Sequence, residues 1–217
     1  IVATLPDNIY FVEGYDSSVF IEEFINEVYN TLAIAMFMVI VVIYLFLGNI
    51  SATLIPAVTV PVSLVAAFIV MYMLGYSINL LTLLALVLAI GLVVDDSIVV
   101  LENIYRRIEM GEPPILAAYR GAREVGFAVI ATTLVLISVF LPLVFLEGNI
   151  GRLFTEFAIA IAAAVAFSSF TALTLSPMLA SKLLKKRERS SGFGKWVDVS
   201  FKKLELTYYN SLTTTIK

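Results

Sequence analysis

Residues 89–103 read AIGLVVDDSIVVLEN, in which the adjacent carboxylates Asp95 and Asp96 stand between two apolar runs. The chain before them is equally apolar, because residues 28–94 contain no Lys, Arg, Asp or Glu. A membrane-spanning helix needs about 20 apolar residues, so this stretch can hold several. A carboxylate inside such a span is costly in hydrocarbon and usually faces a bundle interior or a water path. The pair therefore predicts a proton-handling site in a membrane transporter.

The composition agrees with a membrane protein. Of the 217 residues, 60% are hydrophobic and only 14% are charged, against about 25% charged in a typical soluble domain. The absence of cysteine excludes a disulfide scaffold, a thiolate metal site and a cysteine nucleophile. The absence of histidine means that no imidazole can act as a base, a metal ligand or a proton carrier. Proton exchange inside the spans must therefore use carboxylates.

The apolar runs divide at short polar turns, of which GNIS (48–51) and GYSIN (75–79) are the clearest. In a bilayer the backbone must satisfy its own hydrogen bonds, which leaves helices or closed barrels. The sequence therefore predicts an all-α membrane protein, a bundle of five transmembrane helices near residues 28–47, 54–74, 79–101, 125–146 and 157–181.

The two ends of the chain differ from this apolar middle. Residues 1–27 are interpreted as the tail of an extracytoplasmic domain, with an amphipathic helix over residues 17–31 that leads into the first span. Residues 185–217 are interpreted as a basic linker followed by a helix in the cytoplasmic interface; a soluble helix packed on a neighbouring domain is the alternative. The apolar positions of that helix are Val197, Phe201, Leu204, Tyr208 and Leu212. The chain starts without Met or a signal peptide, so we expect a piece of a longer protein.

The basic residues predict the orientation, because cytoplasmic loops are enriched in Lys and Arg. Residues 1–27 contain no basic residue, and residues 147–156 contain only Arg152. The loop on the other side and the segment after the fifth span carry Arg106, Arg107, Arg120, Arg123, Lys182, Lys185, Lys186, Arg187, Arg189 and Lys195. We therefore expect the start of the chain outside the cytoplasm and its end inside.

Three residues near the aspartate pair are candidates for supporting roles. Gly91 lies one turn before Asp95 and would let a neighbouring helix come close. Glu102 and Asn103 lie seven residues after Asp95 and Asp96, so they extend the polar stripe toward the cytoplasm; Glu102 equally fits the inner end of the span.

No cation lies inside any of the predicted spans. Burial and a like-charged neighbour both favour the neutral form of a carboxyl group. Either the pair stays largely protonated, or its cationic partner lies in sequence outside this chain. Two aspartates that only hydrogen-bond for helix packing are the structural alternative.

Other polar residues are expected to be less informative. Ser and Thr residues at 132–133, 168–169 and 171 can bond back to their own helix backbone. Glu147, Arg152 and Glu156 are expected in a solvated loop. The small residues of AIAIAAAVAFSSF (158–170) permit close helix packing.

Three segments carry a family resemblance: YDSSVFIEEFINEVYNTL, LFLGNISATLIPAVTVPVSLVAAF and GYSINLLTLLALVLAIGLVVDDSIVVLENIYRR. Over about residues 15–185 the chain resembles the resistance-nodulation-division (RND) transporters, in particular the hydrophobe/amphiphile branch of proton-driven multidrug exporters. The resemblance implies that the chain covers the second to sixth transmembrane helices of the N-terminal half.

The resemblance also implies a mechanism and partners. Asp95 and Asp96 would form the proton relay, completed by a lysine and an arginine from the second half of the same transporter. The energy source would be the proton-motive force, with no cofactor and no metal. A homotrimer in the bacterial inner membrane, a periplasmic adaptor and an outer-membrane channel would be its surroundings, and no nucleic acid is implied.

Three other interpretations compete with drug export. An RND exporter of metal ions, lipids or signalling molecules is the nearest alternative, although the metal exporters typically keep a single acid. An intramembrane aspartyl protease also uses two embedded aspartates, but on two different helices, whereas both acids here are on one. A passive scaffold segment would leave the pair without a role. We therefore expect a transporter and not an enzyme.

Overall fold

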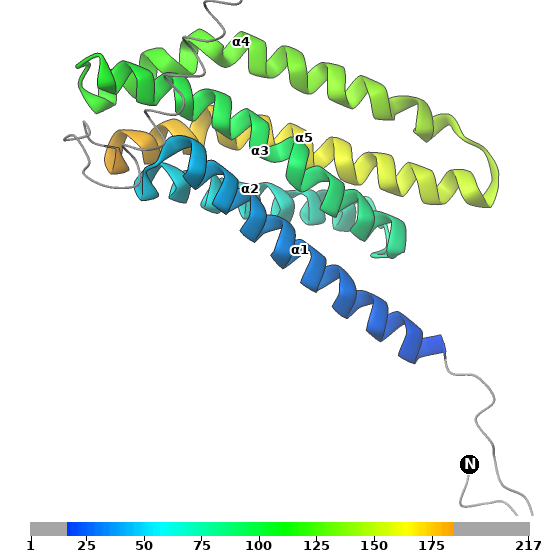
Figure 1. Ribbon diagram of the computed structural model, residues 1–217. Helices are drawn as coiled ribbons and strands as arrows, with labels where there is room; N and C mark the ends of the chain where they lie inside the picture. Colours follow the sequence, from blue (N-terminus) through cyan, green and yellow to red (C-terminus); the bar gives the residue numbers. More distant parts are fainter. Residues whose placement is uncertain (1–16, 185–217) are drawn as a thin grey trace, which may run out of the picture.

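The computed structural model describes residues 17–184, and these residues form five long helices without a strand (Figure 1). The elements are α1 (Ser17–Leu47), α2 (Ile50–Met73), α3 (Leu80–Glu109), α4 (Pro114–Phe140), the 3₁₀ helix η2 (Leu141–Phe145) and α5 (Gly148–Leu183). All five α-helices are long and apolar enough to cross a membrane. The predicted all-α bundle of five spans is confirmed. The predicted interfacial helix lies outside the described residues.

The turns between the helices follow local sequence signals. Gly48 and Gly75 both have positive φ, at 57° and 71°, a conformation that a residue without Cβ adopts readily. Asn49 caps α2 by accepting a hydrogen bond from Ser51 N at 2.9 Å. Asn79 begins α3 with a reciprocal capping box to Thr82. The two polar turns expected from sequence therefore also act as helix stop and start signals.

The helices extend beyond the apolar runs that predicted them, most of all the last three. α3 continues to Glu109, α4 begins at Pro114, and α5 begins at Gly148. The lead-in segment and the first span form one helix, α1, as expected. An apolar run marks the part of a helix that can lie in hydrocarbon, whereas caps, glycines and prolines decide where the helix ends.

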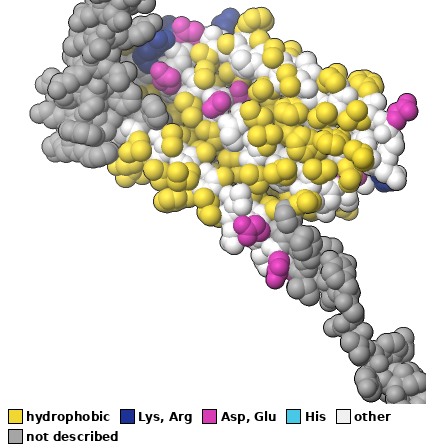
Figure 2. Space-filling model, turned by 45° about the vertical axis from the view of Figure 1, so that its right-hand side comes forward, with side chains coloured by type: hydrophobic (Ala, Val, Ile, Leu, Met, Phe, Trp, Pro, Cys, Tyr) yellow, Lys and Arg dark blue, Asp and Glu magenta, His cyan; other side chains and the backbone are white. Residues whose placement is uncertain are grey.

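α3 and α5 form the centre of the bundle. In the most apolar 18-residue stretch of each helix, 56% is buried in α3 and in α5, compared with 11% in α1 and in α4. Figure 1 shows α1 and α4 on opposite sides of this central pair. Figure 2 shows hydrophobic side chains across the middle of one face, as expected for a surface in contact with lipid.

The seam between α3 and α5 is lined by small side chains. Ala85 and Ala89 of α3 and Ala160 and Ala164 of α5 have no exposed surface. Such residues let two helix backbones come close, as the small-residue run at 158–170 predicts.

α3 and α4 cross closely at Gly121. A Cβ atom at this position would lie 2.9 Å from Ile104 Cγ1 and 3.0 Å from Ile104 Cα. Since one of these atoms is backbone, the contact could be relieved only by moving the helices apart.

We expect Gly121→Ala to lower the free energy of unfolding by about 1–3 kcal/mol, because overpacking forces backbone shifts. Gly126→Ala on the same helix is the control: its Cβ would meet only Leu173 Cδ2, at an ordinary 3.8 Å. Unfolding in mixed micelles would measure both variants. Equal stability of the two would contradict the close crossing.

Candidate functional site

Asp95 and Asp96 lie in the middle of α3 and face different surroundings. Asp96 is buried, with 7% of its surface exposed, whereas Asp95 is exposed at the bundle surface. Adjacent residues on a helix diverge by about 100°. The pair therefore connects the packed interior to a more open side of the bundle.

Asp96 meets α5 through Ser168. The Ser168 hydroxyl lies 3.1 Å from Asp96 Oδ2 and 2.8 Å from the Val93 carbonyl oxygen, with hydrogen-bond geometry to both. A hydroxyl carries one proton, so the two acceptors share a single donor. This arrangement makes the contact sensitive to whether Asp96 carries a proton of its own.

Ser168 is a residue that sequence reasoning missed. Ser and Thr hydroxyls in these spans were expected to bond to their own helix backbone, and Thr132, Thr133 and Thr171 do so. Ser168 instead reaches across to α3. The small-residue run in which it lies was the available signal, because close helix packing brings a short side chain within reach of its neighbour.

A layer of buried hydroxyls accompanies Ser168 in the bundle interior. Thr59 Oγ1 of α2 and Ser97 Oγ of α3 lie 3.1 Å apart. Ser63 Oγ of α2 and Thr171 Oγ1 of α5 lie 2.9 Å apart. Hydrogen bonds between helices satisfy polar groups that would otherwise lie unpaired in hydrocarbon. This layer ties α2 to both central helices.

Both aspartates line a groove of about 640 Å³ between α3 and α4. Its other lining residues are Leu92, Val99, Ala128, Val129, Ala131, Thr132, Val135 and Leu136. None of the lining residues is basic, and the ion pairs found within residues 17–184 all involve Arg107 or Arg120. The groove therefore presents acidic groups on an apolar wall, without a cation from the described chain.

Gly91 makes no close approach to another described helix. It lies on the exposed side of α3, and a Cβ there would meet no atom within 4 Å among the described residues. No described helix makes the expected close approach, because helix rotation places Gly91 away from the α5 seam.

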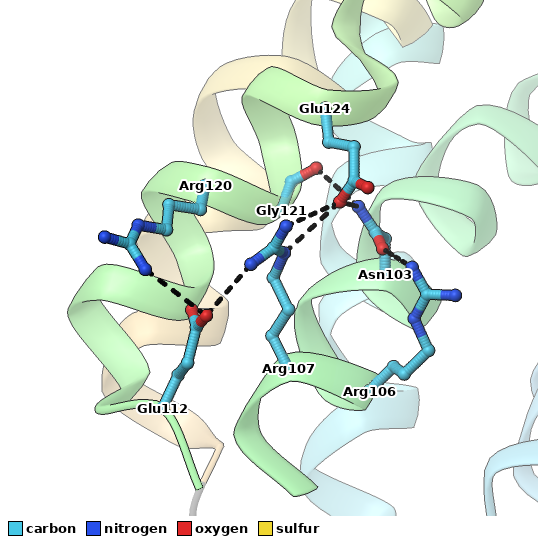
Figure 3. Close-up of polar contacts among 7 residues, drawn as sticks. All are labelled: Asn103, Arg106, Arg107, Glu112, Arg120, Gly121 and Glu124. Atoms are coloured by element: carbon cyan, nitrogen blue, oxygen red, sulfur yellow. Dashed lines mark hydrogen bonds and ion pairs between the residues drawn. The ribbon is translucent and has the colours of Figure 1, made fainter. Parts of the chain in front are cut away.

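Glu102 and Asn103 also point in different directions. Glu102 is exposed, whereas Asn103 is buried against α4. Asn103 Nδ2 donates to the Gly121 carbonyl oxygen and to Glu124 Oε2, both at 2.9 Å (Figure 3). Asn103 Oδ1 accepts a hydrogen bond from Arg106 at 2.7 Å. Asn103 therefore joins α3 to α4 at the point where the two helices come closest.

A charged cluster continues from Asn103 toward the turn between α3 and α4. Arg107 pairs with Glu124 at 2.8 Å and with Glu112 at 3.0 Å, and Arg120 approaches Glu112 at 3.4 Å (Figure 3). Partly exposed ion pairs contribute little to stability individually. This network, however, links α3 to α4 directly through Arg107 and Glu124, and again through Glu112 in the turn. It holds the ends of α3 and α4 together. Within residues 17–184, no three carboxylates are grouped closely enough to hold a metal ion.

The fold and the acid pair define an all-α polytopic membrane protein with ionisable groups inside its spans. The AcrB/AcrD/AcrF family model matches residues 1–217, and the chain belongs to that family. This confirms the resemblance to the RND transporters.

Named relatives agree with this assignment. Multidrug resistance protein MdtC of Yersinia enterocolitica is 48% identical over 198 residues, which cover 89% of this chain and 19% of that protein. MdtC proteins of Yersinia pseudotuberculosis and Yersinia pestis are 46% identical over the same share. The chain therefore spans about a fifth of the length of these relatives.

We expect Asn103→Ala to reduce the free energy of unfolding by about 1–3 kcal/mol, since it leaves the buried Gly121 carbonyl without its side-chain donor. Glu102→Ala, one residue earlier and exposed, should change stability by less than about 0.5 kcal/mol. Unfolding in mixed micelles would compare the two. A smaller effect at Asn103 than at Glu102 would contradict the assignment.

Proposed function

We propose that this chain is part of a proton-driven efflux transporter that exports hydrophobic or amphiphilic compounds, with Asp95 and Asp96 as its proton relay. The observation that carries the proposal is the division of the pair, with Asp96 against Ser168 in the interior and Asp95 exposed beside the groove. Intramembrane ionisable residues generally mark proton or substrate pathways. The names of the relatives support multidrug export over the other RND substrate classes.

The proposed relay works by a change in charge at a site that is poor in water. An ionised carboxylate in an apolar setting needs a cation or strong hydrogen-bond donors, whereas a protonated one does not. Proton binding therefore stabilises one arrangement of the helices relative to another. Such differential stabilisation is all that a ligand, a proton included, can contribute to a conformational change.

The groove supports the proposal that another part of the transporter supplies the missing cation. Its acidic residues and apolar wall fit a helix that carries a Lys or Arg at one position. By family resemblance, that helix belongs to the second half of the same protein. A homotrimer, a periplasmic adaptor and an outer-membrane channel are proposed on the same basis, and the energy source is the proton-motive force without a cofactor.

The placement of the acids argues against an intramembrane aspartyl protease. That reaction needs two carboxylates facing each other from separate helices, whereas Asp95 and Asp96 are adjacent on α3 and face apart. An RND exporter of metal ions, lipids or signalling molecules remains the second candidate, since the acid pair does not itself identify the exported compound.

The proposed orientation places the start of the chain in the periplasm and its end in the cytoplasm, in the bacterial inner membrane. The start of α1 and the end of α5 lie at opposite ends of the bundle (Figure 1). The arginine-rich turn between α3 and α4 lies at the same end as the end of α5, which supports a cytoplasmic position for both.

In the complete transporter, we expect either Asp95→Asn or Asp96→Asn to abolish proton-coupled efflux. Asn keeps the size of Asp and one oxygen acceptor, and it cannot titrate. The measurement is drug efflux under a pH gradient in proteoliposomes, and Glu102→Gln serves as an exposed acid on the same helix. Wild-type efflux by both correctly folded Asn variants would show that the pair is structural.

The cysteine-free chain allows a direct test of orientation. In a transporter without other cysteines, Glu147→Cys should react with a membrane-impermeant maleimide in spheroplasts, whose outer membrane has been opened. Met110→Cys, exposed in the opposite turn, should react only after the inner membrane is opened. The reverse pattern would invert the proposed topology.

A further inference from the structure

Glu156 is a buried carboxylate that the proposed relay does not use. It lies near the start of α5 with 5% of its surface exposed, which corrects its expected place in a solvated loop. Its Oε2 accepts hydrogen bonds from Asn79 Nδ2 at 2.7 Å and from Ser77 Oγ at 3.1 Å. None of the ion pairs within residues 17–184 involves Glu156. A buried acid held only by neutral donors calls for an explanation.

Asn79, which donates a hydrogen bond to Glu156, is the N-cap residue of α3, the helix that carries Asp95 and Asp96. Asn79 Oδ1 accepts from Thr82 N at 3.0 Å, and Asn79 N donates to Thr82 Oγ1 at 2.8 Å. The same amide side chain thus caps α3 through its oxygen and binds α5 through its nitrogen. Glu156 therefore fixes the first residue of the α3 cap against α5.

Alanines form part of the seam between these two contact points, beside larger buried side chains such as Ile161 and Val165. Ala85 and Ala89 of α3 pack close to α5, where Ala160 and Ala164 are also fully buried. Helices normally lock along their axes because side-chain ridges fit into grooves, and alanine ridges are low. Polar contacts at defined positions therefore add to the side-chain packing that sets how far one helix lies along the other.

We propose that Glu156 is a positioning residue for the proton relay, which holds Asn79 and thereby fixes the register of α3 on α5 so that Asp96 meets Ser168. Glu156 makes the outer contact and Ser168 the inner one, on either side of the alanine seam. Glu156 acts through Asn79 and the body of α3 and does not itself carry the transported proton. The inference rests on the proposed function of the aspartate pair.

The test uses the complete transporter with Glu156→Ala, Glu156→Gln and Ser168→Ala. We expect Glu156→Ala to shift the pH profile of efflux in the same direction as Ser168→Ala, and the double variant to add no further shift, because both act on one contact. Hydrogen exchange at the first amides of α3 should be about fivefold faster in Glu156→Ala, since the cap is weakened. Glu156→Gln retains an oxygen acceptor and should restore both readouts.

Two further variants complete the test, one as a control and one as an independent way to break the contact. Glu147→Gln changes an exposed acid at the start of the same helix that makes no side-chain cap bond, and should leave both readouts at wild type. Asn79→Ser keeps a capping oxygen and removes the donor to Glu156. It should shift the pH profile as Glu156→Ala does, and it provides the test if Glu156→Ala does not fold.

The outcomes separate this inference from the proposed function. Efflux that survives Asp96→Asn overturns the relay, and with it the role of Glu156. If Asp96→Asn stops efflux but Glu156→Ala and Asn79→Ser keep the wild-type pH profile, only the positioning role is overturned. Loss of efflux in Glu156→Gln as well as Glu156→Ala also overturns it, because the effect would then belong to the charge.

Discussion

The close contact between α3 and α5 is the interaction on which the rest of the site depends. Fully buried alanines on both helices bring the backbones near enough for the short side chain of Ser168 to reach Val93 and Asp96. With bulkier residues in the seam, the Asp96 carboxyl would lose its only hydrogen bond to the described chain. An unpaired polar group in an apolar setting costs several kcal/mol, so the seam is what makes a buried acid tolerable here.

α3 is held by its neighbours at both ends as well as at its middle. Glu156 of α5 holds its first turn through Asn79, and Asn103 and Arg107 join its last turns to α4. α3 is therefore connected to both α4 and α5, and the proposed change in charge at the pair would act on all three helices. In the proposed relay, this coupling would let the gain of one proton bias a larger rearrangement of the helices.

The sequence predicted correctly the features that depend on the polarity of single residues, such as the number of helices. It did not predict the features that depend on which side of a helix a residue faces. The apolar runs and polar turns correctly predicted five helices, yet α3 continues to Glu109 because helix ends depend on caps and glycines. Glu156 was expected in a solvated loop because it is charged. Its burial against α3 could not be read from the sequence. Gly91 is small enough for close helix packing, but no atom of another described helix lies within 4 Å of the position that its Cβ would take.

The sequence by itself determined that the chain is a bundle of membrane-length helices and that two carboxylates lie inside one of them, because hydrocarbon admits few polar residues. It did not determine which acid is buried, which hydroxyl meets it, or that Asn103 joins two helices. Those features depend on how each helix is rotated about its axis. Rotation is set by packing between segments far apart in the chain, where Ala164 against α3 and Gly121 against Ile104 decide how closely the helices approach.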